Sequence, residues 1–193
     1  MSDRGSQTRI RILNAARGLY SSHGSDGTTL DDIITASGVT KGAFYHYFKS
    51  KEALCIDLIE LAAKEYTELI EGIDPCLGPL DKLKELVRLL DELNSNGKWV
   101  NCKLILRLSA DSDQGHPEMK EKLRGFWHWY TKVFEEIITE CQKAGELTNN
   151  IDAHTQTKMI MSLIAGAITF ERIDRRQKGF EDEVKILIEK LSV

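Results

Sequence analysis

Apolar side chains recur at intervals of three and four residues along almost the whole chain, and this spacing limits the possible folds more than any other feature. In the first such run, Ile12, Ala16, Leu19 and Tyr20 fall on one face of a helix, and Gly24 follows as a helix-ending glycine. No alternating run of apolar and polar residues bounded by turns points to a strand. The sequence therefore predicts an all-α protein.

Glycines, prolines and capping residues divide this pattern into about nine helices. The clearest boundary is the stretch from Gly72 to Pro79, which holds two glycines and two prolines. Asp152 is the expected N-cap of the eighth helix. We predict helices at about 7–23, 30–37, 41–47, 51–71, 79–93, 99–110, 117–143, 153–173 and 180–191.

The second and third of these helices are short and are separated by a tight turn. Gly38 can adopt the crowded backbone of that turn, and Val39 would lie between the two helices as a buried contact. Thr28 and Thr29 are candidate caps of the second helix, each followed three residues later by an aspartate, and Thr40 can cap the third. Two short helices with this turn form a helix-turn-helix, whose second helix reads base edges in the major groove of DNA.

The net charge of −4 argues against a DNA-binding protein only if the charge is evenly spread. Residues 1–54 contain seven Lys/Arg and five Asp/Glu and carry +2, whereas residues 55–193 carry −6. A slightly basic end on an acidic body is compatible with a small DNA-reading domain joined to a larger sensing domain.

Residues 8–54 resemble the start of a tetracycline-repressor (TetR) family regulator. Two runs carry the resemblance, T-R-x-x-I-L-x-A-A-x-x-L-Y-x-x-x-G-x-x-x-T-T-L-x-D-I at 8–33 and S-G-V-T-K-G-A-F-Y-x-Y-F-x-x-K-E-x-L at 37–54. The resemblance implies a three-helix helix-turn-helix domain at 1–54, a fourth helix at 51–71 as the linker, and a helical-bundle domain at 55–193 that binds an effector and dimerises. Beyond residue 54 only the number and order of helices agree.

The resemblance also implies which side chains contact DNA. We expect His46 to contact a base, together with Lys41 and Ala43, and Lys51 to hold a phosphate. Phe44 and Phe48 are interpreted as core residues, and Lys49 is as compatible with a solvated side chain as with a phosphate contact. The expected DNA-binding residues are Thr28, Thr29, Thr40, Lys41, Gly42, Ala43, Tyr45, His46, Tyr47 and Lys51.

Family members dimerise through their last two helices, and this chain has a small-residue patch and an apolar seam there. A symmetric pair would place two reader helices about 34–36 Å apart on a pseudo-palindromic operator. The alternative is that the seam packs only within its own chain. The expected interface residues are Ala165, Gly166, Ile168, Phe180, Val184, Leu187, Ile188 and Leu191.

An effector pocket is expected among the fourth to eighth helices, and its aromatic residues suggest a small hydrophobic effector. The alternative is that most of these aromatic side chains form core. The expected lining residues are Trp99, Cys102, Arg107, Phe126, Trp127, His128, Tyr130, Phe134, Met159 and Phe170. Cys102 lies near the start of the expected sixth helix, beside Lys103. Thiol-based sensing of electrophiles or oxidants is therefore an alternative sensing step, and the competing interpretation is that Cys102 is an inert thiol.

Other classes of protein find little support in the sequence. It shows no Gly-rich phosphate loop, nucleophile elbow or paired acids, so we expect no enzyme, catalytic residue or cofactor. The four cysteines and five histidines are scattered, so we expect no metal. The apolar stretches are too short for a membrane span, and no leader peptide begins the chain, which favours a cytoplasmic protein. A helical protein-interaction adaptor is the rival class, but it leaves the run from Thr40 to Phe48 unexplained.

Overall fold

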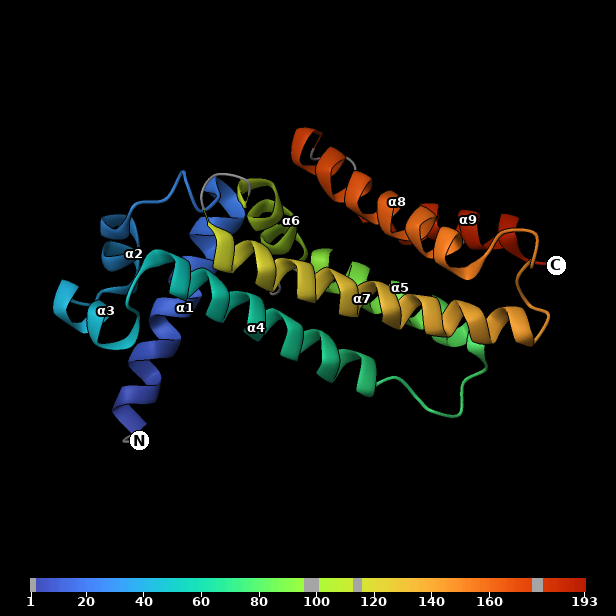
Figure 1. Ribbon diagram of the computed structural model, residues 1–193, viewed down its shortest axis with the longest axis horizontal. Helices are drawn as coiled ribbons and strands as arrows, with labels where there is room; N and C mark the ends of the chain where they lie inside the picture. Colours follow the sequence, from blue (N-terminus) through green and yellow to red (C-terminus); the bar gives the residue numbers. More distant parts are fainter. Residues whose placement is uncertain (1–2, 96–100, 113–115, 175–178) are drawn as a thin grey trace. The chain divides into compact units, whose positions relative to one another are not determined.

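The computed structural model describes residues 3–95, 101–112, 116–174 and 179–193, and these residues form an all-α fold (Figure 1). Besides the helices, Leu147 and Ser192 form an isolated antiparallel β-bridge. The helices are α1 (Asp3–His23), α2 (Leu30–Ser37), α3 (Lys41–Tyr47), α4 (Lys51–Glu71), α5 (Pro79–Ser95), α6 (Asn101–Asp111), α7 (Pro117–Lys143), α8 (Ala153–Ile173) and α9 (Glu181–Leu191).

These bounds confirm the expected all-α fold with nine helices among the described residues. The largest difference lies at the start of α1, which begins at Asp3 instead of residue 7. Its first turn is polar and offers no apolar period to mark it. Phe180 is the N-cap of α9 instead of its first residue. None of the helices in the described part of the chain is long and apolar enough to cross a bilayer.

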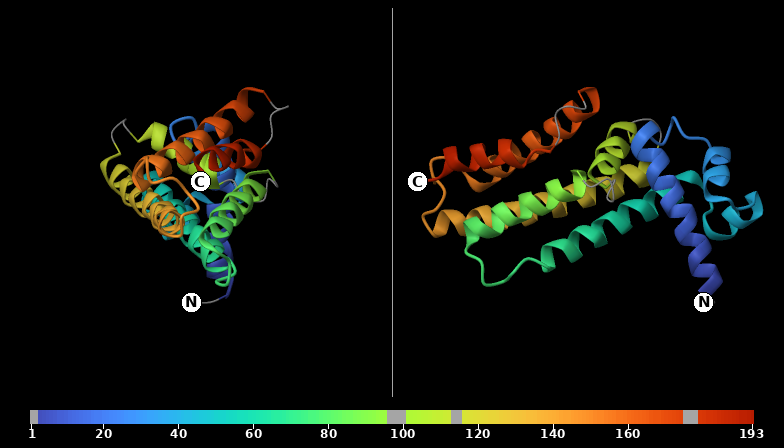
Figure 2. Two further views of the ribbon diagram at one scale, coloured as in Figure 1. Left: turned by 90° about the vertical axis from the view of Figure 1, so that its right-hand side faces the viewer. Right: turned by 180° about the vertical axis from the view of Figure 1, so that it is seen from behind.

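The chain packs into two compact units. Unit 1 comprises Met1–Glu65 and Val100–Phe126, and unit 2 comprises Tyr66–Trp99 and Trp127–Val193. The boundary expected at residue 54/55 would place α6 with the body, whereas in the structure α6 packs against α1 in unit 1, as Figures 1 and 2 show. The helix-turn-helix segment and α6 therefore share one packed core.

The core of unit 1 forms where the apolar faces of α1, α2, α3 and α4 meet. Ile12, Ala16 and Tyr20 are completely buried, as the spacing of α1 predicted. Ile33 from α2 and Phe44 from α3 are also completely buried. Each fully buried apolar side chain of this size contributes about 1.5–3 kcal/mol relative to exposure, so a few of them suffice to hold the short helices in place.

Unit 2 is held together by the packing of α9 on α5 and α8 and by a buried aromatic cluster. Asp91 of α5 accepts a hydrogen bond from the backbone N–H of Phe180 at 2.8 Å and so supports the first turn of α9. Burial is the main cause that raises the pKa of Asp91 above its usual value, and the nearby negative charge of Glu181 raises it further. At the other end of the unit, Gln142 and Gln156 both donate to the carbonyl of Thr148, which fixes the loop between α7 and α8.

Candidate functional site

The start of α2 is fixed by a reciprocal pair of hydrogen bonds. The Thr29 hydroxyl accepts from the backbone N–H of Asp32 at 3.1 Å, and the Asp32 carboxylate accepts from the backbone N–H of Thr29 at 2.8 Å. The Thr29 hydroxyl also donates to the Asp32 carboxylate at 2.6 Å, and this bond, ahead of the one from the backbone N–H, holds the pKa of Asp32 below its usual value. The capping box inferred from the sequence is present, with Thr29 and not Thr28 as the cap.

The turn between α2 and α3 has the geometry that its glycine permits. Gly38 has a φ of 64° in the left-handed region, where a side chain would be strained. α3 begins directly after this turn. Its N-cap is Thr40, whose hydroxyl accepts a hydrogen bond from the backbone N–H of Ala43 at 3.2 Å. The turn and the second cap therefore set the direction in which α3 leaves α2.

One face of α3 is buried and the other is open. Phe44 is completely buried and Phe48, which follows the helix, is nearly so, which confirms their interpretation as core. Lys41, Gly42 and His46 are exposed on the opposite side. Tyr45 is 50% exposed. Ala43 and Tyr47 are half-buried at the border between the two faces. The exposed side offers one cation, one imidazole, one phenol and a bare stretch of backbone at Gly42.

Two of the expected DNA-contacting side chains are engaged inside unit 1. Thr28 is only 1% exposed, and its hydroxyl donates to the carbonyl of Gly24 at 2.8 Å, so this side chain, expected among the DNA-binding residues, is turned into unit 1. Lys51 is half-buried, and its ammonium donates to the carbonyls of Ser25 at 2.8 Å and Thr28 at 2.6 Å. These contacts hold the segment between α1 and α2 against α4.

Arg11 is a basic residue near the turn that the sequence pattern did not single out. Its guanidinium approaches the carbonyl of Gly38 at 3.5 Å from α1. Arg9, two residues earlier on α1, instead pairs with Asp57 of α4 at 2.6 Å and stacks over the ring of Phe48, 5.5 Å from the ring centre. The two arginines lie on different sides of α1, Arg9 toward the buried face and Arg11 on the exposed face.

The apolar seam of α9 packs within its own chain. Val184, Ile188 and Leu191 are buried, as are Phe180 before the helix and Ile168 of α8, so a single chain already covers these five expected interface side chains. Their side chains lie where α9 packs against its neighbours α5 and α8. Ala165, Gly166 and Leu187 are half-buried.

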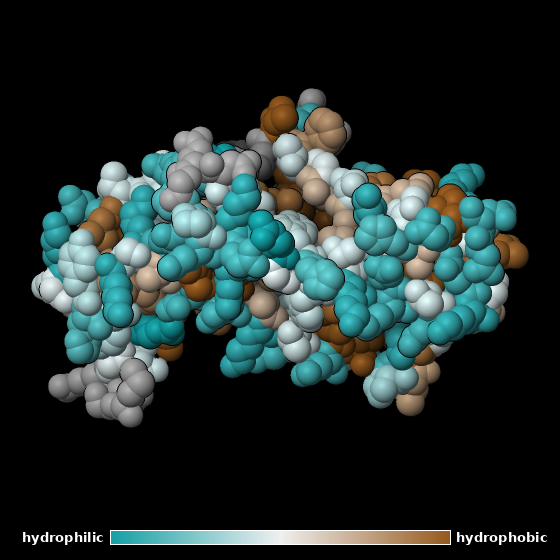
Figure 3. Space-filling model, viewed as in Figure 1, coloured by the Kyte–Doolittle hydropathy of each residue, from teal (hydrophilic) through white to brown (hydrophobic). Residues whose placement is uncertain are grey.

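A different apolar stripe lies on the outer face of α8. It is formed by residues that repeat every three or four positions, opposite the buried face of the helix. Phe170 is 61% exposed and Ile173 is 78% exposed, and apolar surface stands out at the C-terminal end of α8 in Figure 3. Ile186 on α9 is exposed as well. The stripe consists of Met159, Leu163, Gly166, Phe170 and Ile173.

The residues expected to line an effector pocket are divided between the two units. Met159 and Phe170 belong to this outer stripe and are exposed. Arg107 and the half-buried Cys102 lie on α6 in unit 1, and Phe126 is buried there on α7. Trp99 lies outside the described residues.

Tyr130 is the centre of the aromatic cluster in unit 2. Its ring lies 5.4 Å from that of Tyr66 and 5.3 Å from that of Phe134 between ring centres. Trp127 and Trp129 approach it from the same helix at 6.1 and 6.2 Å. Tyr130 and Phe134 are buried, so in this conformation they form core, as the alternative interpretation held.

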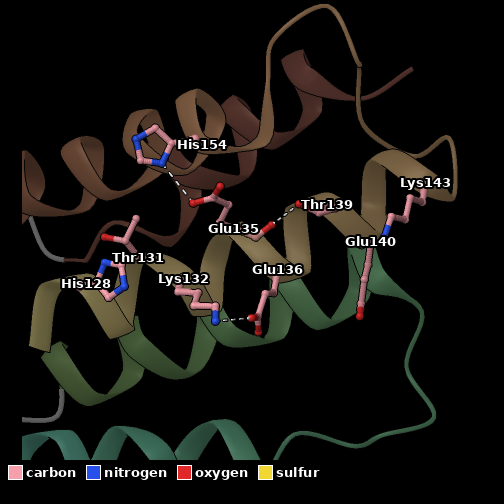
Figure 4. Close-up of a pocket in the computed structure, with 9 residues that line it drawn as sticks. All are labelled: His128, Thr131, Lys132, Glu135, Glu136, Thr139, Glu140, Lys143 and His154. Atoms are coloured by element: carbon pink, nitrogen blue, oxygen red, sulfur yellow. Dashed lines mark hydrogen bonds and ion pairs between the residues drawn. The ribbon is translucent and has the colours of Figure 1, made fainter. Parts of the chain in front are cut away.

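An open groove of about 680 Å³ lies along the outer side of α7 in unit 2 (Figure 4). His128 is the pocket residue expected from the sequence that lines it, among the described residues. His154 of α8 contributes to the wall and lies 3.1 Å from the carboxylate of Glu135. Because lysine, glutamate, threonine and histidine side chains line this groove, it lacks the apolar walls of a site for a hydrophobic effector.

Comparison with protein families gives two matches along the chain. Residues 12–58 match the family described as "Bacterial regulatory proteins, tetR family". Residues 79–187 match the family described as "Tetracyclin repressor-like, C-terminal domain". The second match alone spans more than half of the chain, and together the two include the helix-turn-helix and most of the body.

Individual relatives agree with these matches. The chain is 26% identical over 172 residues to the HTH-type transcriptional regulator UidR of Escherichia coli strain K12, covering 87% of this chain and 83% of that protein. Its fold resembles a regulatory protein TetR from Rhodobacter sphaeroides, with a TM-score of 0.82, 21% identity and coverage of 95% and 98% of the two chains. It also resembles the Bacillus subtilis regulator FadR in complex with stearoyl-CoA, with a TM-score of 0.75, 21% identity and coverage of 94% and 96%.

Proposed function

The chain belongs to the TetR family of bacterial helix-turn-helix transcriptional regulators, a family of DNA-binding proteins and not of enzymes. From this premise we propose that it is a homodimeric repressor, which a small hydrophobic effector releases from its operator. The observation that carries the proposal is the division of α3 into a buried face at Phe44 and an open face at Lys41, Tyr45 and His46. In this proposal residues 1–54 are the DNA-binding domain, and α4 links it to the remaining residues, which sense the effector and dimerise.

The open face of α3 supports a role in reading DNA because its chemistry suits the major groove. His46 can donate to or accept from a base edge, and Lys41 can contact a phosphate or a guanine. Gly42 lets the backbone approach the duplex closely. The Thr29 cap leaves backbone N–H groups at the start of α2, a favourable place for a phosphate. Together these groups would fix the helix in the groove and specify a sequence.

Dimerisation is supported by the outer stripe of α8. A soluble surface rarely leaves a contiguous apolar stripe uncovered, and a two-fold dimer buries the same patch of both copies against each other. Gly166 near the middle of the stripe would allow two helices to approach closely. We therefore place the interface on Met159, Leu163, Gly166, Phe170 and Ile173, with Ile186 of α9 beside them, instead of on the buried seam of α9.

A hydrophobic effector is supported by the aromatic cluster around Tyr130 and by one relative. The structure of FadR from Bacillus subtilis holds stearoyl-CoA, an acyl chain with a large polar head. An effector that separated the rings around Tyr130 would replace ring–ring contacts by contacts with its own apolar surface. The effector can shift the protein toward a conformation with low operator affinity only by binding that conformation more tightly.

The proposal is tested by joining effector binding to operator binding in one titration. Genomic fragments bound by the purified full chain are recovered, and the shortest common duplex is labelled for fluorescence anisotropy. Stearoyl-CoA, free stearate and 1-naphthol are then added as probes, with tryptophan fluorescence reporting binding near Trp127 and Trp129. A probe that changes the tryptophan signal is expected to weaken operator binding at least about tenfold, a coupling of roughly 1.4 kcal/mol. A probe that binds the body and leaves operator affinity unchanged would contradict the coupling.

A further inference from the structure

Asn94 is a buried polar residue whose hydrogen bonds are incompletely satisfied. It lies in the last turn of α5 and is 4% exposed. Its side-chain N–H donates to the carboxylate of Glu171 on α8 at 3.0 Å. Its amide oxygen is buried and has no hydrogen-bond partner among the described residues. Because a carboxylate accepts hydrogen bonds, the amide nitrogen must face Glu171, and the oxygen remains as an acceptor for another group.

Apolar side chains lead up to this polar contact from both helices. On α5, Asn94 follows Leu90 by one turn and Leu86 by two, and both leucines are completely buried. On α8, Glu171 follows the buried Ile168 by about one turn. All of these residues belong to unit 2. A few polar groups at the end of an apolar surface are typical of a site for a small organic molecule.

Several negatively charged groups lie near this contact. Asn94 and Glu171 are in the last turns of their helices, where the terminal carbonyl groups carry partial negative charge. Asp91 lies one turn before Asn94. Burial raises the pKa of Asp91, and the negative charges of Glu181 and Glu171 raise it further, which shows that these carboxylates interact. Such surroundings disfavour an anion and favour a hydrogen-bond donor with a positive charge.

We propose that Asn94 and Glu171 form the polar end of the effector site and recognise a protonated nitrogen on an effector whose remaining surface is apolar. The ammonium donates to the amide oxygen of Asn94, which gains its missing partner, and to the carboxylate of Glu171. The amide oxygen is buried here, so the ligand binds a conformation in which the ends of α5 and α8 admit it. This preference for one conformation is what allows a ligand to act as an effector. The role as effector rests on the proposed function, whereas the binding does not.

Three probes of nearly equal size test the charge preference by isothermal titration calorimetry with the full chain. They are 1-naphthylmethylamine, which is protonated at about pH 7, 1-naphthalenemethanol and 1-naphthoic acid. The amine is expected to bind at least about tenfold more tightly than the alcohol, because its hydrogen bonds carry a charge. The acid is expected to bind more weakly than the alcohol. An amine that binds no better than the alcohol, or no binding by any of the three, would overturn the proposal.

Substitution of Glu171 assigns this preference to the proposed site. Glu171→Gln keeps the size of the side chain and one acceptor but removes the charge. It is expected to weaken binding of the amine about tenfold and to leave binding of the alcohol within about twofold. Glu92→Gln, at an exposed position of α5, is the control for loss of a carboxylate and should keep the parent affinity for the amine. Equal affinities for the amine in the parent and Glu171→Gln proteins would overturn the role of Glu171.

Asn94→Leu separates ligand recognition from a structural role. Replacement of an incompletely paired buried amide by an apolar side chain of similar size is expected to leave the urea midpoint unchanged or to raise it. The preference for the amine over the alcohol should be lost in the same protein. A retained preference would overturn the role of Asn94. These titrations contain no DNA, so the two proposals can fail separately. A chain that binds its operator without preferring the amine refutes only this inference, and one that prefers the amine but binds no duplex refutes the proposed function.

Discussion

Phe44 and Tyr45 are neighbours on α3, with ring centres 5.5 Å apart and ring planes at 89°, yet Phe44 is completely buried and Tyr45 is half exposed. The two rings therefore have different roles in this helix. Phe44 fixes the helix to the core of unit 1, and Tyr45 rests edge-on against it while facing outward. A helix of seven residues has little stability of its own, so its position depends on such contacts.

Substitution of these two residues is expected to affect different properties. Phe44→Ala removes a fully buried ring and is expected to lower the free energy of unfolding by about 3–5 kcal/mol. Tyr45→Ala should leave the urea midpoint close to that of the parent protein but weaken operator binding. Urea denaturation and anisotropy on the same preparations provide the comparison. A large loss of stability in Tyr45→Ala would mean that Tyr45 is a core residue.

The outer stripe of α8 predicts the oligomeric state. Phe170→Lys places a charge in the proposed interface and is expected to convert the proposed dimer to a monomer, because an unpaired buried charge costs several kcal/mol. Lys158→Glu, on a polar part of the same helix, is the control and should stay dimeric. Analytical ultracentrifugation at micromolar concentrations measures both. A Phe170→Lys protein that sediments as the parent dimer would place the interface elsewhere.

The capping box at the start of α2 predicts a pH dependence. Hydrogen bonds from Thr29 lower the pKa of Asp32 in the folded protein, while the unfolded chain has the ordinary value of about 3.9. The unfolded state therefore binds the proton more tightly, and the contribution of Asp32 to stability is present above that value and lost as the pH falls through the lowered pKa. The difference in urea midpoint between the parent protein and Asp32→Asn should be largest near pH 7 and shrink toward pH 3. A difference independent of pH would show that the carboxylate charge does not stabilise the cap.

The cysteines differ in the reactivity that their surroundings allow. Burial raises the pKa of the Cys55 thiol to about 11, and burial together with the Glu146 charge raises that of Cys141 to about 12. With Ellman's reagent at pH 8, exposed Cys76 should react at once, and Cys55 and Cys141 should react only after unfolding. Cys102 is half-buried, and a slow reaction is expected. A fast reaction of Cys102 that also releases the operator, and that Cys102→Ser abolishes, would favour thiol sensing over effector binding.

Features set by neighbouring residues could be predicted from the sequence. The turn at Gly38, the cap at Thr40 and the division of α3 at Phe44 depend on contacts within a few residues, and the spacing of apolar side chains determines which face is buried. The two adjacent threonines before α2 were the exception. Thr28 and Thr29 are equivalent as a pattern, and only the fold shows that Thr28 turns inward to Gly24 while Thr29 caps the helix.

Contacts between distant helices could not be predicted in this way. The apolar period of α9 requires that Val184 and Ile188 be covered but does not say whether their own chain or a second copy covers them. Lys51 has the same charge whether it faces a phosphate or the carbonyl of Ser25. Asp111 lies 86 residues from Ser25 in sequence, so their contact follows from the packing of α6 on α1 and not from any local pattern.

One measurement tests most directly the claim that the open face of α3 reads DNA. The affinities of the parent and His46→Ala proteins are measured by fluorescence anisotropy at one salt concentration. Each protein is titrated with the selected operator and with a scrambled duplex of equal length. The parent protein is expected to prefer the operator by at least about a thousandfold. His46→Ala should reduce that preference about 10–100-fold, the discrimination of one base contact, while its affinity for the scrambled duplex stays unchanged. A parent protein that binds both duplexes equally, or a His46→Ala protein that keeps the full preference, would contradict the account.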